Sequence, residues 1–176
     1  IHIDTWDKDK ASMYLSGVTV TGGALDEDVA VPCFPCYAAG AIFAYNLDTL
    51  FADHVTIKNN TGHEGTGGGI RVTGAAQTNR LVKITNSNIY NNTSYYGQPV
   101  QIDNTTKIEI SNTIISNNNT ENPRTGLSFS GPDTAIVVNT TIANNKNTNN
   151  TDSRGLYISM SSGVDSVLIM NSIISQ

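Results

Sequence analysis

The chain has 176 residues, of which 15 are acidic and 10 are basic, so its net charge is −5. Only 14% of the residues are charged and 38% are hydrophobic, while Asn and Thr are abundant. This length is enough for one domain with its own core. No segment approaches the roughly 20 apolar residues of a membrane-spanning helix. The acidic balance and the lack of a basic cluster argue against nucleic acid as a partner.

The first twelve residues, 1–12, are expected to form an irregular entry to the fold. They contain Asp4, Asp7 and Asp9, and clustered carboxylates suit a hard cation such as calcium. The stretch "DKDKAS" (7–12) lacks the further oxygen ligand and the glycine that a calcium loop requires. We therefore favour a solvated acidic corner and expect no cofactor, with a calcium site at these three residues as the weaker alternative.

Residues 23–39 are expected to form a long loop insertion, which holds the only two cysteines in "PCFPC" (32–36). One such pair cannot supply the four ligands of a structural zinc site. Pro35 argues against the helix that a redox CxxC motif normally opens. In an exported protein this leaves two free thiols or a small-loop disulfide between Cys33 and Cys36. We favour the disulfide, as a staple on the insertion.

An internal repeat organises the rest of the chain. "VKITNSNIYNN" (82–92), "IEISNTIISNN" (108–118) and "IVVNTTIANN" (136–145) share alternating apolar residues, then an Asn, an apolar Ile and a polar break, and "VLIMNSIISQ" (167–176) starts the pattern again. The Asn that precedes the Ile by three residues defines one column, whose members are Gly17, His54, Asn86, Asn112, Asn139 and Asn171. A second column follows at the polar break: Gly22–Gly23, Asn59–Asn60, Asn91–Asn92, Asn117–Asn118 and Asn144–Asn145.

A third column indicates β-strands. In each repeat an apolar residue is followed by another two positions later, which is the period of a strand with one buried face; the first residues of these pairs are Ile42, Ile70, Val100, Leu127 and Leu156. Pro, Gly and Asn interrupt every candidate helix. Units this small cannot bury a face alone and must stack. A propeller blade needs about 40 residues, whereas Asn86 and Asn112 are only 26 apart.

The fold prediction is therefore an all-β, right-handed parallel β-helix of about five to six coils, forming a single segment over 1–176 of a longer β-helix. Residues 167–176 start a truncated coil. We expect the first Asn column to face inward at a bend, where the side chains hydrogen-bond to the copies above and below as a ladder. Its members are His54, Asn86, Asn112, Asn139 and Asn171, and the ring of His54 takes the place of one amide.

A family resemblance supports this prediction. "NTTIANN" (139–145), "GGGI" (67–70) and "NSIIS" (171–175) resemble the repeats of bacterial exported right-handed β-helix proteins, in particular the choice-of-anchor Q domain proteins. They are also similar to the repeats of chlamydial polymorphic outer-membrane proteins. The resemblance covers residue 13 to the end, and it implies an extracellular or cell-surface rod. It carries no catalytic residues, because these repeats are structural.

Some β-helix proteins are polysaccharide lyases or glycoside hydrolases. "FADHVTI" (51–57) is similar to an Asp-His element of pectate lyases, and "GHEG" (62–65) is similar to a polygalacturonase element whose Asp partners are missing here. A lyase needs converging carboxylates with a base, and a hydrolase needs two facing carboxylates. The acidic residues after residue 52 fall in different columns, so we assign no catalytic residue. We expect a non-catalytic scaffold acting in adhesion, surface display or assembly; the alternative is a lyase or hydrolase whose groove lies partly outside this segment.

The expected partner is a polysaccharide or another surface protein. Tyr90, Tyr95 and Tyr96 are the candidate sugar contacts, because exposed aromatic rings stack on sugars, although packing within a loop also explains them. The Asn-x-Thr triplets match glycosylation acceptors, but Asn- and Thr-rich corners produce such triplets by chance. The strands of 167–176 pair only on their upstream side, so a further coil or a partner chain is expected to cover them.

Overall fold

The structure is a computed structural model that describes residues 1–4, 11–24, 40–62, 67–74, 80–95, 97–121, 124–149, 154–160 and 166–175. Five residues singled out from the sequence lie outside these ranges: Asp7, Asp9, Cys33, Cys36 and Tyr96. Asp4 lies in the first strand, where only the backbone is described. Within the described ranges there is no helix of any kind, and hence none long and apolar enough to cross a bilayer.

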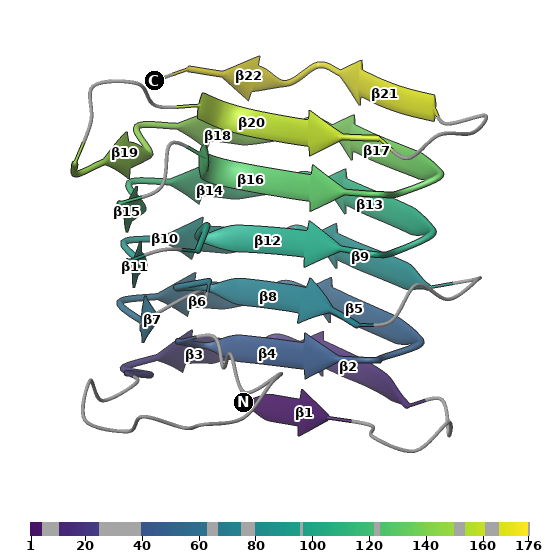
Figure 1. The fold of residues 1–176 in the computed structure, drawn as a ribbon, viewed down its shortest axis with the longest axis horizontal. Coiled ribbons are helices and arrows are strands. Elements are labelled where there is room, and N and C mark those ends of the chain that lie inside the picture. Colours follow the sequence, from purple (N-terminus) through teal and green to yellow (C-terminus); the bar gives the residue numbers. More distant parts are fainter. Residues whose placement is uncertain are drawn as a thin grey trace.

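The strands form four parallel sheets that run along the axis of a solenoid, and each complete turn of the chain adds one strand to each sheet (Figure 1). Sheet A contains β1 (His2–Asp4), β4 (Ile42–Tyr45), β8 (Ile70–Thr73), β12 (Val100–Asp103), β16 (Arg124–Ser130) and β20 (Arg154–Ser159). Sheet B contains β2 (Ser12–Ser16), β5 (Thr49–Asp53), β9 (Leu81–Thr85), β13 (Lys107–Ser111), β17 (Thr134–Val138) and β21 (Ser166–Met170). Sheet C contains β3 (Thr19–Thr21), β6 (Thr56–Lys58), β10 (Asn88–Tyr90), β14 (Ile114–Ser116), β18 (Thr141–Ala143) and β22 (Ile173–Ile174). Sheet D contains β7 (Thr61–Gly62), β11 (Thr93–Ser94), β15 (Asn119–Thr120) and β19 (Lys146–Asn147).

The all-β parallel solenoid is confirmed, but it has about four turns rather than five to six. The complete turns are β4–β7, β8–β11, β12–β15 and β16–β19. In the described residues, β1–β3 before them and β20–β22 after them contribute no strand to sheet D. The sequence count was too high because each Asn column includes members from these incomplete turns. Residues 2–4, which fall in the expected irregular entry, form β1 and pair with β4.

Stacked apolar side chains fill the interior. The strand column predicted from the sequence forms one continuous file across sheet A: Ile42, Ile70, Val100, Leu127 and Leu156. The first four of these side chains are almost inaccessible to solvent, and equivalent files line the inner faces of sheets B and C. Full burial of one such side chain stabilises the fold by roughly 1.5–3 kcal/mol. The register of the turns therefore follows from like side chains lying above one another.

Each bend between sheets B and C, and between C and D, begins with a residue in the left-handed conformation. His54, Asn86 and Asn112 have φ values of 52°, 51° and 50° at the first bend, and Asn91 and Asn117 have φ values of 54° at the second. Asn and His tolerate this region better than most residues with a side chain. In every complete turn the left-handed residue is exposed and the next residue is buried. A bend thus presents one side chain outward and the following one inward.

A ladder of buried Asn side chains runs through the second bend. The sequence pattern instead predicts an inward ladder at the first bend, with members His54, Asn86, Asn112, Asn139 and Asn171. Asn86, Asn112 and Asn139 do hydrogen-bond to one another as a ladder, but the predicted inward orientation is wrong. All five residues take the left-handed conformation at the first bend, so their side chains point outward and are exposed. The inner Asn ladder consists of Asn60, Asn92, Asn118 and Asn145, which are at most 1% exposed. Successive Nδ2–Oδ1 distances along it are 2.8, 3.0 and 2.9 Å.

The inner ladder also satisfies backbone groups of the bend. The Oδ1 of Asn118 accepts from the backbone N–H of Asn92 (2.9 Å), and its Nδ2 donates to the carbonyl of Ile89 (3.1 Å). The same arrangement recurs at Asn92 and Asn145. Since a buried polar group without a partner costs about 1–3 kcal/mol, each rung supports both neighbouring turns.

We predict that Asn118→Ala lowers the free energy of unfolding by roughly 2 kcal/mol or more, because it leaves several buried groups without partners. Equilibrium urea unfolding followed by circular dichroism measures the loss. Asn117→Gly is the matched control: it removes the adjacent, exposed amide and keeps a residue that adopts the left-handed conformation freely, so the change should stay within about 0.5 kcal/mol. Equal losses in the two variants would contradict a structural ladder.

Candidate functional site

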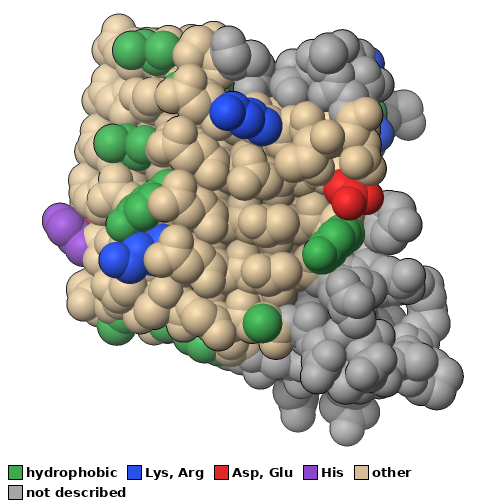
Figure 2. All heavy atoms as spheres, turned by 90° about the vertical axis from the view of Figure 1, so that its left-hand side faces the viewer, with side chains coloured by type: hydrophobic (Ala, Val, Ile, Leu, Met, Phe, Trp, Pro, Cys, Tyr) green, Lys and Arg blue, Asp and Glu red, His purple; other side chains and the backbone are tan. Residues whose placement is uncertain are grey.

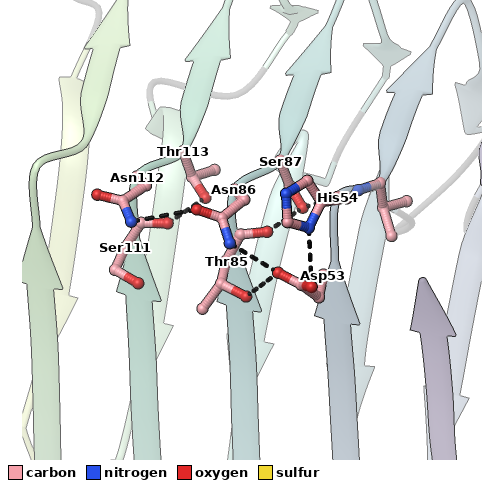
Figure 3. Close-up of polar contacts among 9 residues, drawn as sticks. Asp53, His54, Thr85, Asn86, Ser87, Ser111, Asn112 and Thr113 are labelled. Atoms are coloured by element: carbon pink, nitrogen blue, oxygen red, sulfur yellow. Dashed lines mark hydrogen bonds and ion pairs between the residues drawn. The ribbon is translucent and has the colours of Figure 1, made fainter. Parts of the chain in front are cut away.

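A file of exposed side-chain amides runs along the first bend (Figure 3). The outer amide file consists of Asn86, Asn112 and Asn139. The Nδ2 of Asn139 donates to the Oδ1 of Asn112 (3.2 Å), and the Nδ2 of Asn112 donates to the Oδ1 of Asn86 (3.1 Å). Asn171 occupies the same bend in the following turn. Asn86, Asn112 and Asn139 all donate in one direction, toward the N-terminal turns.

The outer amide file ends on the carboxylate of Asp53 at the C-terminal end of β5. Its Oδ1 accepts from the Nδ2 of Asn86 (2.8 Å) and from the Oγ1 of Thr85 (2.6 Å), and its Oδ2 lies 2.8 Å from the Nδ1 of His54. These hydrogen bonds, that of Thr85 foremost, lower the pKa of Asp53 from 3.8 to about 2. Asp53 is therefore a fully ionised acceptor at neutral pH.

His54 occupies the position of an amide but does not continue the file. Asn86 donates to Asp53 instead, and the His54 ring turns to the same carboxylate (Figure 3). Because the carboxylate faces Nδ1, it favours the tautomer with the proton on Nδ1. In that tautomer Nε2 is a hydrogen-bond acceptor. The side chain of His54 is 66% exposed. The pair can therefore offer a hydrogen-bonding imidazole of fixed orientation to a ligand in solvent.

A second polar cluster lies on the outer face of sheet A. The Nε2 of Gln101 donates to the Oδ2 of Asp103 (2.6 Å) on β12. Burial raises the pKa of Asp103 above its usual value, while the Gln101 bond and the positive charges of Arg71 and Arg124 partly oppose this rise. The guanidinium of Arg124 lies 3.7 Å from the ring centre of Tyr157, and the rings of Phe43 and Tyr45 are stacked with centroids 6.4 Å apart. A partly buried carboxyl with a raised pKa is a candidate proton donor.

Two of the three predicted sugar-contact tyrosines, Tyr90 and Tyr95, lie in the described part of the chain. Tyr90 lies on β10 in sheet C, where the Nζ of Lys58 is 6.0 Å from its ring centre. Tyr95 follows β11 in sheet D, and Tyr96 is outside the described residues. The described part of the chain also contains no group of three or more His, Cys, Asp or Glu side chains placed to hold a metal ion.

Comparison with protein families identifies the fold family. A family model described as a right-handed β-helix region matches residues 40–176, which is more than half of the chain. The chain belongs to the right-handed β-helix family. Comparison with curated proteins gave no significant match, and comparison with solved structures gave none.

Sequence reasoning missed two features of this β-helix. The arginines beside the Gln101–Asp103 pair stand on other strands. Arg71 on β8 lies opposite Gln101 in the register, and Arg124 is on β16, so no single repeat contains the whole cluster. The inner Asn ladder did leave a signal, the repeated Asn-Asn doublet. Its first member takes the left-handed conformation outside and its second is buried inside.

We predict that the β-helix loses stability on acidification from about pH 4 to about pH 2 as Asp53 is protonated. A carboxyl whose pKa is lower in the folded state than in the unfolded state binds fewer protons when folded, so its contribution is complete above the unfolded pKa of 3.8 and lost as the pH falls through about 2. Carbon-13 NMR titration of the Asp53 carboxyl measures the pKa. Thr85→Val should move it toward 3.8, whereas Thr134→Val, on the same face of sheet B, should not. A wild-type pKa near 4 would contradict the geometry.

Proposed function

We propose that this chain is a non-catalytic scaffold segment of a bacterial, exported or cell-surface β-helix protein, which acts in adhesion, surface display or assembly by binding a polysaccharide along its lateral faces. The observation that supports this best is that side-chain hydrogen bonds join all four complete turns through the inner Asn ladder. Side-chain hydrogen bonds fix the conformation of the second bend in each of these turns. The result is a rigid solenoid segment with outward side chains at regular intervals.

The lateral surface fits this role. Figure 2 views the left-hand side of Figure 1, where sheet D lies, and the described side chains there are mainly uncharged and polar, with few charges. On the outer face of sheet B the charged groups pair with one another: the carboxylate of Glu109 lies 3.1 Å from the Nζ of Lys83 and 2.6 Å from the Nζ of Lys107. A neutral polar surface rich in Asn, Ser and Thr suits an exported protein.

A carbohydrate-active enzyme is the second candidate, and the raised pKa of Asp103 favours it. Glycoside hydrolysis needs a second carboxyl about 5–10 Å away. In the described strands of sheet A, the other acidic residue is Asp4 on β1. Asp4 is three strands from Asp103 in the sheet order, which corresponds to about 14 Å at the usual strand spacing. The backbones of these two strands are therefore farther apart than the two carboxyls of a glycoside hydrolase.

We predict that the protein yields no products from plant or algal polysaccharides, as judged by mass spectrometry of the digest. Unsaturated or shortened oligosaccharides would contradict the scaffold proposal. If they appear, Asp103→Asn tests the second candidate, because it should abolish them when Asp103 is the proton donor. Asp133→Asn changes an exposed carboxylate outside sheet A and should leave the products unchanged.

The C-terminal face of the rod is the proposed site for a further coil or a partner chain. Val167 and Ile169 on β21 continue the buried files of Ala135 and Val137, yet they are 40% and 42% exposed. Ile173 and Ile174 on β22 are also exposed. An apolar strand edge of this kind favours pairing with another strand.

We predict that this segment associates as its concentration rises and that Val167→Lys/Ile169→Lys prevents association, because inward charges block the addition of a strand. Sedimentation velocity over a hundredfold concentration range measures the effect. The control, Ile136→Lys/Val138→Lys, adds the same charges to outward positions of β17 and should associate like the wild type. A wild-type segment that stays monomeric throughout would contradict the proposal.

A further inference from the structure

We propose that the outer amide file is a binding site for a linear, uncharged glycan, which lies along the solenoid axis with about one sugar residue per turn. This inference deepens the proposed function, because it names the surface and the class of polysaccharide. It concerns the bend between sheets B and C, well separated in the turn from the polar cluster on sheet A.

The first support is the hydrogen-bonding capacity that the file leaves unused. A side-chain amide has two N–H donors and two acceptor lone pairs. Asn112 uses one N–H to bond Asn86 and one lone pair to accept from Asn139, and its side chain is exposed. One donor and one acceptor remain for a ligand at this rung. A sugar hydroxyl also combines one donor with acceptor lone pairs, so a repeated amide matches a repeated hydroxyl.

The second support is the rigidity and spacing of the file. Neighbouring strands lie about 4.8 Å apart, and the amides are held at this repeat by their bonds to one another. This distance is comparable with the length of one pyranose residue in an extended β-linked chain. Because the amides are already ordered, little side-chain entropy is lost when a ligand binds.

The third support is an aromatic surface at the N-terminal end of the file. Tyr14 on β2 and Phe51 on β5 are opposite each other on the outer face of sheet B, with ring centroids 6.2 Å apart. Tyr14 is 70% exposed. Phe51 precedes Asp53 by two residues, so both side chains are on the same face of the strand. Aromatic rings combine apolar area with few rotatable bonds, and they suit the C–H face of a sugar ring.

The same end of the file is open at Gly17. Gly17 occupies the bend position in the turn before His54, and a Cβ added there would meet no atom within 4 Å. His54 therefore borders an open position rather than another side chain. A sugar that rests on Tyr14 can occupy this position and hydrogen-bond to the imidazole.

The charges nearby indicate an uncharged ligand. Lys83 and Lys107 share Glu109, and the carboxylate of Asp53 is bonded by three donors. Two lysines and two carboxylates leave the outer face of the described sheet B strands with no net charge from Lys, Arg, Asp and Glu. A uronate chain would find no unpaired cation among these groups, whereas a neutral glycan would lose no charge hydration on binding.

The second bend supplies a matched control. Asn91, Asn117 and Asn144 are exposed and take the same left-handed conformation, but no amide–amide bond joins them in the described structure. Asn86→Gly/Asn112→Gly/Asn139→Gly and Asn91→Gly/Asn117→Gly/Asn144→Gly are therefore equal in composition and in backbone demands. They differ in which bend loses its amides, and the first variant also removes the hydrogen bond from Asn86 to Asp53.

The experiment is isothermal titration calorimetry of the intact protein with cellohexaose, xylohexaose, mannohexaose and chitohexaose, and with hexagalacturonate as the charged comparison. We expect at least one neutral hexasaccharide to bind, the first triple variant to bind it at least tenfold more weakly, and the second to stay within twofold of the wild type. Tyr14→Ala should also weaken binding. Thermal melting checks that both triple variants are folded.

The proposal is overturned if no neutral hexasaccharide binds at millimolar concentration, if hexagalacturonate binds more tightly, or if the two triple variants lose affinity equally. Failure of the scaffold proposal has a different signature. Chromatography of the recovered hexasaccharide would then show shorter products, whether or not the outer amide file contributes to binding.

Discussion

One residue in the left-handed conformation at each bend determines how this solenoid is built. It breaks the simple alternation of a strand: the last residue of the strand and the left-handed residue both face outward, and the next residue faces the interior. Asn can adopt this conformation at low cost, and the sequence supplies Asn at nearly every such position. The inner ladder and the outer amide file are both consequences of this conformation, at successive bends of the same turn.

Stacking of the turns stabilises strands that are too short to be stable alone. A two- or three-residue strand has little stability alone, but each turn here pairs in register with the turns on either side. The inner ladder adds buried hydrogen bonds at the second bend, where backbone groups would otherwise lack partners. The apolar files and the ladder thus act on different parts of the turn, the first on the sheets and the second on the corner.

The fold was predictable because stacking imposes a period on the chain. Ile42, Ile70 and Val100 share a file because each opens the same strand in its own turn, and their spacing shows this directly. The direction of a side chain at a bend was not predictable in the same way. Asn86 and Asn92 are the same residue type at two bends of one repeat. Only the backbone conformation of each bend places the side chain of Asn86 outside and that of Asn92 inside. The Gln101–Asp103 cluster depends on contacts between turns, which no single repeat contains.

The shared direction of the outer amide bonds has a consequence for recognition. Each amide from Asn139 to Asn86 donates toward the N-terminal turns, and the series ends on a negative charge at Asp53. The two ends of the file are therefore chemically different: one is an anion beside an imidazole, and the other is an amide. A polymer with distinct ends would meet these groups in opposite order if it were reversed, so a ligand that bound along the proposed site would have a preferred direction.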